Sequence, residues 1–220
     1  MLKVVVFDSG YGGELFADQL EEALPVVEVI RVIDWRNAEK IQSSSRGARQ
    51  CAREALRPYI GKVDLIIFAN YLLSITSLKY FQRKFKNQQF LGLSLKKPET
   101  FIQREIVILT TKPVAKTINY YNFLFHLKQK ARTLLLDSWT GKIDDGELTE
   151  TEISQTIHNF LKKDDLKLKE VILACAHFND IKTELKHSFG HNLKINDSFN
   201  DTIIKTCKIL KIRGGVGKKN

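Results

Sequence analysis

The sequence lacks any apolar run long enough to cross a bilayer. Its longest runs, residues 4–7 and 65–69, have the length of strands, whereas a membrane helix needs about 20 apolar residues. The first residues already read as a strand, which leaves no room for the charged and apolar regions of a secretory signal. We therefore expect a cytoplasmic protein without a membrane partner.

Cysteine is scarce, and the three that occur are far apart. Cys51, Cys175 and Cys207 form no close-spaced zinc or disulfide pattern, so a reducing compartment and no metal site are expected. Cys51 and Cys207 fall at apolar positions of expected helices, which favours packing over chemistry.

Acidic residues are too few to balance the basic ones, and the formal charge is +10. Such an excess can indicate a polyanion partner. The lysines are dispersed over nearly every expected helix, often beside acids, which is typical of solvated helix faces. Nucleic acid is therefore the less favoured partner.

Short β-rich runs alternate with amphipathic segments of helical length. The expected strands are residues 4–7, 27–33, 65–69, 90–93, 106–109, 133–136, 171–174 and 193–195. The expected helices are residues 14–24, 44–59, 73–85, 114–130, 150–163, 181–189 and 201–210. This order predicts an α/β protein with parallel sheets and ligand sites at the carboxyl ends of the strands.

The remaining segments read as connections. Residues 139–151 are polar and contain glycine, which predicts a loop ending at a capping box from Thr149 to Glu152. Residues 96–98 and 196–197 are candidate crossing points between two lobes. The last residues, 213–220, are expected to form a flexible tail.

Three strand ends carry residues suited to chemistry. The first is DSGYGG at residues 8–13, which opens a helix where backbone amides favour an anion; a structural turn is the alternative. The second is ACAH at residues 174–177, where His177 and a following helix would favour the thiolate of Cys175; an inert buried thiol is the alternative. The third is FANY at residues 68–71, where Asn70 can hold a carboxylate or cap a helix.

Together these strand ends resemble the glutamate racemase family within the wider aspartate/glutamate/hydantoin racemase group. The DSGxGG turn matches residues 8–13, the family's Ala-Cys-Asn-Thr loop matches residues 68–71, and its Gly-Cys-Thr-His loop matches residues 174–177. The TTKPV run at 110–114 and the NDS run at 196–198 resemble two further family segments. The resemblance covers essentially the whole chain.

The resemblance implies two pseudo-symmetric parallel-sheet lobes with a cleft between them. Lobe 1 would comprise residues 1–96 and 197–212, and lobe 2 residues 97–196. In such racemases two thiols face opposite sides of the substrate α-carbon, one removing a proton and the other returning one, without pyridoxal, metal or other cofactor. A small amino acid or carboxylate would be the ligand, and a homodimer is one assembly to expect.

The implied site residues follow from these matches. Cys175, Asp8 and His177 would be catalytic, with Asp8 assisting the first thiol and His177 the second. The substrate-binding positions would be Ser9, Asn70, Tyr71, Thr110, Thr111 and Ala176.

The sequence departs from the family at the position of the first thiol. Ala69 stands where the first cysteine is expected, so a two-base racemase cannot operate with the usual groups. Tyr71 and Ala176 replace two threonines that would hold the substrate carboxylate, and residues 34–45 contain no Pro-Tyr-Gly. Glutamate specificity is therefore in doubt.

Three hypotheses remain open. The chain is an engineered Cys-to-Ala form of an active isomerase, a single-cysteine enzyme that protonates an enolate-like intermediate at Cys175, or a non-catalytic protein that binds a small carboxylate or a partner. A polyanion-binding protein is a further alternative.

Overall fold

The computed structural model describes residues 1–95, 106–127, 131–161 and 168–212. The chain divides into two compact units, residues 1–94 with 198–220 and residues 95–197. No helix among the described residues is long and apolar enough to cross a membrane. The expected crossing at 96–98 and the expected tail at 213–220 lie outside the described residues.

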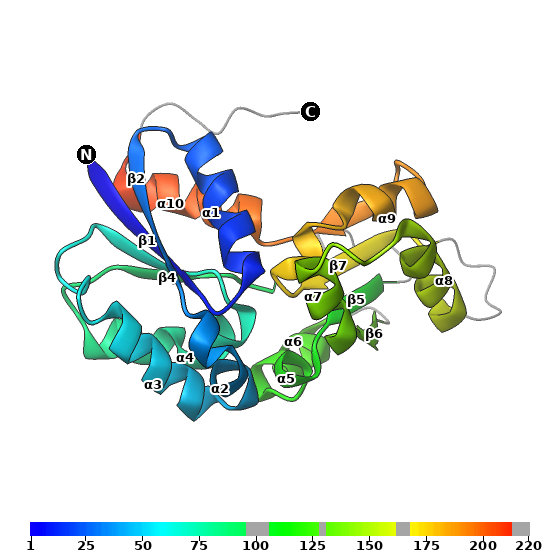
Figure 1. Cartoon of the computed structure of the whole chain (residues 1–220), viewed down its shortest axis with the longest axis horizontal. Coiled ribbons are helices and arrows are strands. Elements are labelled where there is room, and N and C mark those ends of the chain that lie inside the picture. Colours follow the sequence, from blue (N-terminus) through cyan, green and yellow to red (C-terminus); the bar gives the residue numbers. More distant parts are fainter. Residues whose placement is uncertain (96–105, 128–130, 162–167, 213–220) are drawn as a thin grey trace. The chain divides into compact units, whose positions relative to one another are not determined.

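The first unit contains one parallel sheet with helices on its faces (Figure 1). The strand order is β2-β1-β3-β4. Its strands are β1 (Leu2–Asp8), β2 (Val27–Ile33), β3 (Leu65–Phe68) and β4 (Phe90–Gly92), and its helices are α1 (Tyr11–Ala23), η1 (Trp35–Asn37), α2 (Ala38–Ser43), α3 (Ser45–Leu56), α4 (Tyr71–Lys84) and α10 (Phe199–Leu210).

The second unit repeats this topology with the strand order β6-β5-β7-β8. Its strands are β5 (Ile106–Thr110), β6 (Ala131–Leu135), β7 (Glu170–Ala174) and β8 (Lys194–Asn196), and its helices are α5 (Lys112–Ala115), α6 (Ile118–His126), α7 (Asp137–Asp144), α8 (Glu150–Leu161), η2 (His177–Asn179) and α9 (Lys182–Phe189). All pairings in both sheets are parallel. The prediction of an α/β protein with two pseudo-symmetric parallel-sheet lobes is confirmed.

The middle residues of the central strands β1, β3, β5 and β7 are apolar and buried because helices cover both faces of each sheet. In the first unit, Phe68 packs edge-on against Phe7 and Phe81. The last helix, α10, closes this core through Phe199, whose ring lies 5.0 Å from that of Phe16. The chain therefore returns to its first unit to complete that unit's packing.

Gly13, the last glycine of the DSGYGG turn, is required by close packing between α1 and the sheet. A Cβ atom there would lie 2.4 Å from Cβ of Asp8 and 2.8 Å from Cδ1 of Ile33. Only glycine lets α1 start so close to the ends of β1 and β2.

The prediction of a loop at residues 139–151 is wrong for the first half of that segment, where the structure has helix α7. Trp139 and Ile143, one helical turn apart, are both buried and anchor this helix. The helix ends before Gly146, which has φ +68°. At the predicted capping box, Thr149 does accept from the Glu152 amide at 3.2 Å, but the Glu152 carboxylate binds Lys142.

The single helix expected at 114–130 is also wrong. Over its described residues the segment forms two helices, α5 and α6, because Thr117 caps the second by accepting from the Tyr120 amide at 3.1 Å. Residues 38–43, which carried no helical expectation, form α2.

Candidate functional site

In the first unit, Asp8 and Asn70 join the loops that follow β1 and β3. Asp8 is only 2% exposed, and its Oδ1 accepts from the Ser9 amide at 2.6 Å and from Asn70 Nδ2 at 2.8 Å. The same Asn70 nitrogen lies 3.3 Å from Ser9 Oγ. These contacts hold the Asp8 carboxylate at the carboxyl edge of the sheet.

Asn70 also caps helix α4, because its Oδ1 accepts from the Leu73 amide at 2.9 Å. Its side chain thus has a capping role and a role in holding Asp8 and Ser9. A ligand carboxylate bound by Asn70 would have to share the amide that Asp8 now accepts from.

Ala69 directly precedes Asn70 in the chain and is fully buried. It follows β3 directly, and its amide donates to the Phe7 carbonyl at 2.9 Å, which extends the pairing of β3 with β1. Its side chain is a methyl group, so this position supplies neither an acid nor a base.

Tyr71 is also buried, and its hydroxyl is used within the first unit. The phenol donates to Ser198 Oγ at 2.8 Å, which ties the start of α4 to the residue that precedes α10. This bond gives Tyr71 a structural role that a threonine, with its shorter side chain, could not perform.

In the second unit, Cys175, His177 and Asp144 form a chain of polar contacts. Cys175 is the first residue after β7, and its Sγ lies 3.8 Å from His177 Nδ1. On the other side of the ring, His177 Nε2 lies 3.2 Å from Asp144 Oδ1. Cys175 is 9% and His177 8% exposed, so both are largely shielded from water.

This arrangement permits a proton to move from the thiol to the imidazole. If the Nε2 proton faces the Asp144 carboxylate, a neutral ring has its lone pair on Nδ1, directed toward Cys175. Transfer of the thiol proton would give a thiolate and an imidazolium, and Asp144 would stabilise the positive ring.

Helix α7 brings Asp144 to this position. The Trp139 ring packs edge-on against Phe178 of η2, with centroids 6.2 Å apart, and so docks α7 beside His177. Nearby, burial and then the Glu184 charge raise the pKa of Asp180, while His177 acts in the opposite direction. The imidazole therefore lies in acidic surroundings.

The remaining predicted residues of the second unit differ in how their polar groups are used. Thr110 is fully buried, and its hydroxyl lies 3.3 Å from the Ala174 carbonyl. Thr111 is half-buried at the start of α5, and its hydroxyl does not cap that helix. Ala176 is buried, and its carbonyl accepts from both nitrogens of Asn179, at 3.0 and 3.1 Å.

Comparison with known proteins places this geometry in a family context. No family model matches the chain. A glutamate racemase of Aquifex aeolicus is 23% identical over 220 residues, covering 97% of this chain and 85% of that protein. The Escherichia coli glutamate racemase structure, solved with L-glutamate and an activator, matches with a TM-score of 0.82 at 18% identity, covering 97% of this chain and 84% of that one. The chain is a homologue of the glutamate racemases.

A second solved glutamate racemase, from Campylobacter jejuni, matches with a TM-score of 0.77 at 21% identity. The match covers 100% of this chain and 89% of the Campylobacter jejuni chain. The family resemblance drawn from the three strand ends is therefore confirmed. The roles of individual residues in this racemase homologue stay predictions.

The repeated topology gives Ala69 and Cys175 equivalent places in the two units. Ala69 follows β3 and Cys175 follows β7, and these strands hold the same position in their sheets. The structure brings Asp8, Ser9 and Asn70 together in one unit and Cys175 with His177 in the other.

Asp144 is the residue of this site that the sequence analysis missed. Its segment was read as a loop, and the carboxylate is far from His177 along the chain. The apolar pair at Trp139 and Ile143, spaced as on one helix face, was the available signal.

Proposed function

We propose that this racemase homologue performs one-sided acid–base chemistry on a small amino or carboxylic acid. Cys175 exchanges a proton with the substrate α-carbon, His177 receives the thiol proton, and Asp144 orients the ring. The observation that carries the proposal is the Cys175–His177–Asp144 chain, whose contacts are 3.8 and 3.2 Å long.

The proposed step needs no second base. The Cys175 thiolate takes the α-proton, the electron pair moves into the adjacent carboxyl group as an enediolate, and the same thiol returns a proton to the same face. Where a substrate loses carbon dioxide, the electron pair of the broken carbon–carbon bond forms the enediolate, and Cys175 protonates it from one side.

Ala69 supports one-sided chemistry over racemisation. A methyl group cannot deliver a proton to the opposite face, and the nearby Asp8 is held by Ser9 and Asn70. The competing proposal is a non-catalytic protein that binds a small carboxylate, and the same alanine favours it.

Isotope exchange separates these two proposals. The panel contains amino, 2-hydroxy and malonic acids, and glutamate comes first because the E. coli relative was solved with L-glutamate. In heavy water, we expect the wild-type protein to catalyse α-deuterium uptake or carbon dioxide release. The Cys175→Ala variant should abolish both activities. Cys207→Ala, which removes a half-buried thiol of α10, is the matched control and should keep full activity. If wild type and Cys175→Ala give equal rates over the whole panel, the catalytic proposal fails.

A further inference from the structure

The first unit also has a pocket of about 360 Å³. It is formed where β2 ends and α3 passes over it, and no residue of the predicted site lines it. Val32, Ala55 and Tyr59 supply apolar walls, and Cys51 lies below them, 1% exposed. The lining thus combines apolar side chains with the polar side chains of Asp34, Asn37 and Glu54, which suits a small molecule that has both an apolar part and a charged group.

The polar groups of the pocket are acidic. Asp34, which follows β2 directly, and Glu54 of α3 both line it. Asp34 accepts from Asn37 Nδ2 at 2.9 and 3.0 Å, and Glu54 accepts from Gln50 Nε2 at 3.1 Å. Both partners are neutral amides, so neither carboxylate has its charge balanced by a hydrogen-bonded cation.

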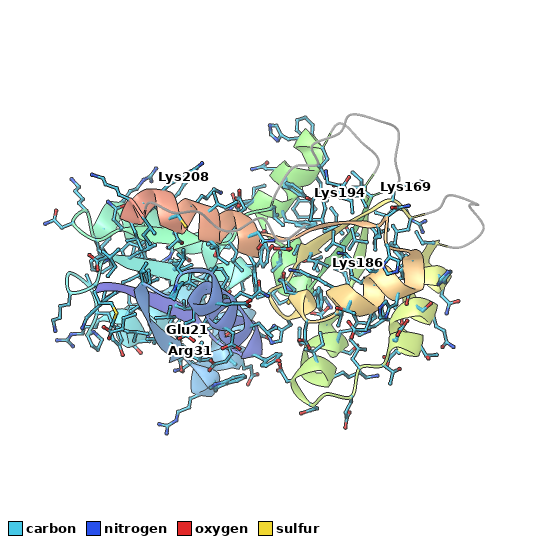
Figure 2. The ribbon with its side chains drawn as sticks, turned by 90° about the horizontal axis from the view of Figure 1, so that it is seen from above. Glu21, Arg31, Lys169, Lys186, Lys194 and Lys208 are labelled. Atoms are coloured by element: carbon cyan, nitrogen blue, oxygen red, sulfur yellow. The ribbon has the colours of Figure 1, made fainter. Side chains whose placement is uncertain are left out.

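Carboxylates elsewhere beside β2 are neutralised. Arg31 of β2 binds Glu14 and Asp18 of α1 at 3.1 and 2.7 Å and also reaches Glu21, as Figure 2 shows for the last pair. Among the residues that the structure describes, Asp34 and Glu54 form no such ion pair.

The charges around the pocket act on the thiol beneath it. Burial raises the pKa of Cys51, the exposed Lys40 ammonium acts against this, and Asp34 and Glu54 add to it. Two carboxylates therefore oppose one exposed lysine, and the pocket has an acidic excess.

We propose that this pocket binds a small organic cation, a protonated amine with an apolar body. The apolar part would pack on Val32 and Ala55, and the ammonium group would lie between Asp34 and Glu54. The Tyr59 ring adds a surface on which a cation can rest. The site does not depend on the chemistry proposed for Cys175, because the two lie in different units.

The test uses three probes of similar shape and different charge: phenethylammonium, 2-phenylethanol and 3-phenylpropanoate. Binding to the full chain is followed by NMR shifts of the amides around Asp34 and Glu54. We expect phenethylammonium to bind and the neutral and anionic probes to bind more weakly. Equal binding of all three probes, or no binding of the amine at millimolar concentration, overturns the proposal.

Variants locate the site. Glu54→Gln keeps the hydrogen bond from Gln50 and removes one charge, so amine affinity should fall about two- to fivefold. Asp34→Asn removes the other charge of the pocket and should lower amine affinity in the same way. Ala55→Phe fills the pocket and should abolish amine binding. Glu39→Gln, an exposed residue of α2 outside the pocket, is the matched control and should leave affinity unchanged. Unchanged binding in both charge variants and in Ala55→Phe overturns the proposal.

Discussion

His177 is the residue that links the two ends of the proposed site, since it contacts Cys175 through one ring nitrogen and Asp144 through the other. The thiol can lose its proton only if the facing nitrogen is free to accept it. In the proposed step Asp144, whose Oδ1 lies 3.2 Å from His177 Nε2, favours that form of the ring by accepting from the opposite nitrogen. At the same scale, Ala69 supplies no proton at all, so the two equivalent strand ends contribute unequally.

Asp144→Asn should therefore slow Cys175-dependent exchange by about 10- to 100-fold. The amide can present its nitrogen to the ring and stabilise the wrong form, and it cannot balance an imidazolium charge. The measurement is the pH–rate profile of exchange. Asp145→Asn, next in the chain, is the control and should change neither rate nor profile. An unaltered profile in Asp144→Asn would remove this residue from the account.

Gly13→Ala should destabilise the first unit by about 1–3 kcal/mol, because its Cβ would lie 2.4 Å from Cβ of Asp8 and force α1 away from β1. Urea unfolding measures this directly. Because the displaced atom belongs to Asp8, amide shifts at Ser9 and Asn70 should move as well. A variant as stable as wild type would show that α1 can shift without loss.

At the scale of elements, the sequence predicted best where one apolar pattern decides the structure. Strands such as β1 and β7 are buried on both faces, so each appears in the sequence as a short continuous apolar run, which predicts a buried strand. Helix α7 was missed because six of its eight residues are polar or glycine, and only Trp139 and Ile143 reveal its buried face. The contact between Asp144 and His177 follows from how α7 docks on η2, which is a property of tertiary packing.

Gly141→Ala tests the assignment of α7 as a helix. The added Cβ would meet nothing within 4 Å, so alanine should raise the free energy of unfolding by about 0.5–1 kcal/mol through helix propensity alone. Gly146→Ala, just beyond the helix at φ +68°, is the opposite control and should destabilise. Destabilisation by Gly141→Ala in thermal or urea unfolding would indicate that the segment is not helical in solution.

At the scale of the whole molecule, both units use one topology, and the proposed acid–base residues lie in the second. The excess of positive charge does not follow this division. Figure 2 labels Lys208 on α10 of the first unit, and Lys169 and Lys194 in the second, where the Lys194 amide donates to the Lys169 carbonyl. Lysines are thus spread over both units, as the sequence predicted.

Nucleic-acid binding should accordingly be weak and fall steeply with salt. The appropriate measurement is a titration with double-stranded DNA at salt concentrations from about 50 to 200 mM. Over this range a protein with many phosphate contacts loses a factor of about 10³–10⁵ in affinity. We expect no micromolar binding at the upper salt concentration. Tight binding there would favour the polyanion alternative.

Ala69→Cys tests whether a thiol at this position is enough to give racemisation. We expect at most weak racemisation, because Ala69 is fully buried and the adjacent Tyr71 hydroxyl is bound to Ser198. Ala69→Ser, of nearly the same size, is the control. Full glutamate racemisation by Ala69→Cys would instead identify the chain as an inactivated enzyme of the ordinary kind.

The stereochemistry of exchange tests the central claim, one-sided chemistry at Cys175, most directly. Each enantiomer of a substrate from the panel is incubated with wild-type protein in heavy water, and the product is analysed for deuterium and for configuration. The account predicts α-deuterium with retained configuration from one enantiomer, and no uptake by Cys175→Ala. A deuterated mixture of both enantiomers would contradict it, because inversion requires a second acid that Ala69 cannot provide.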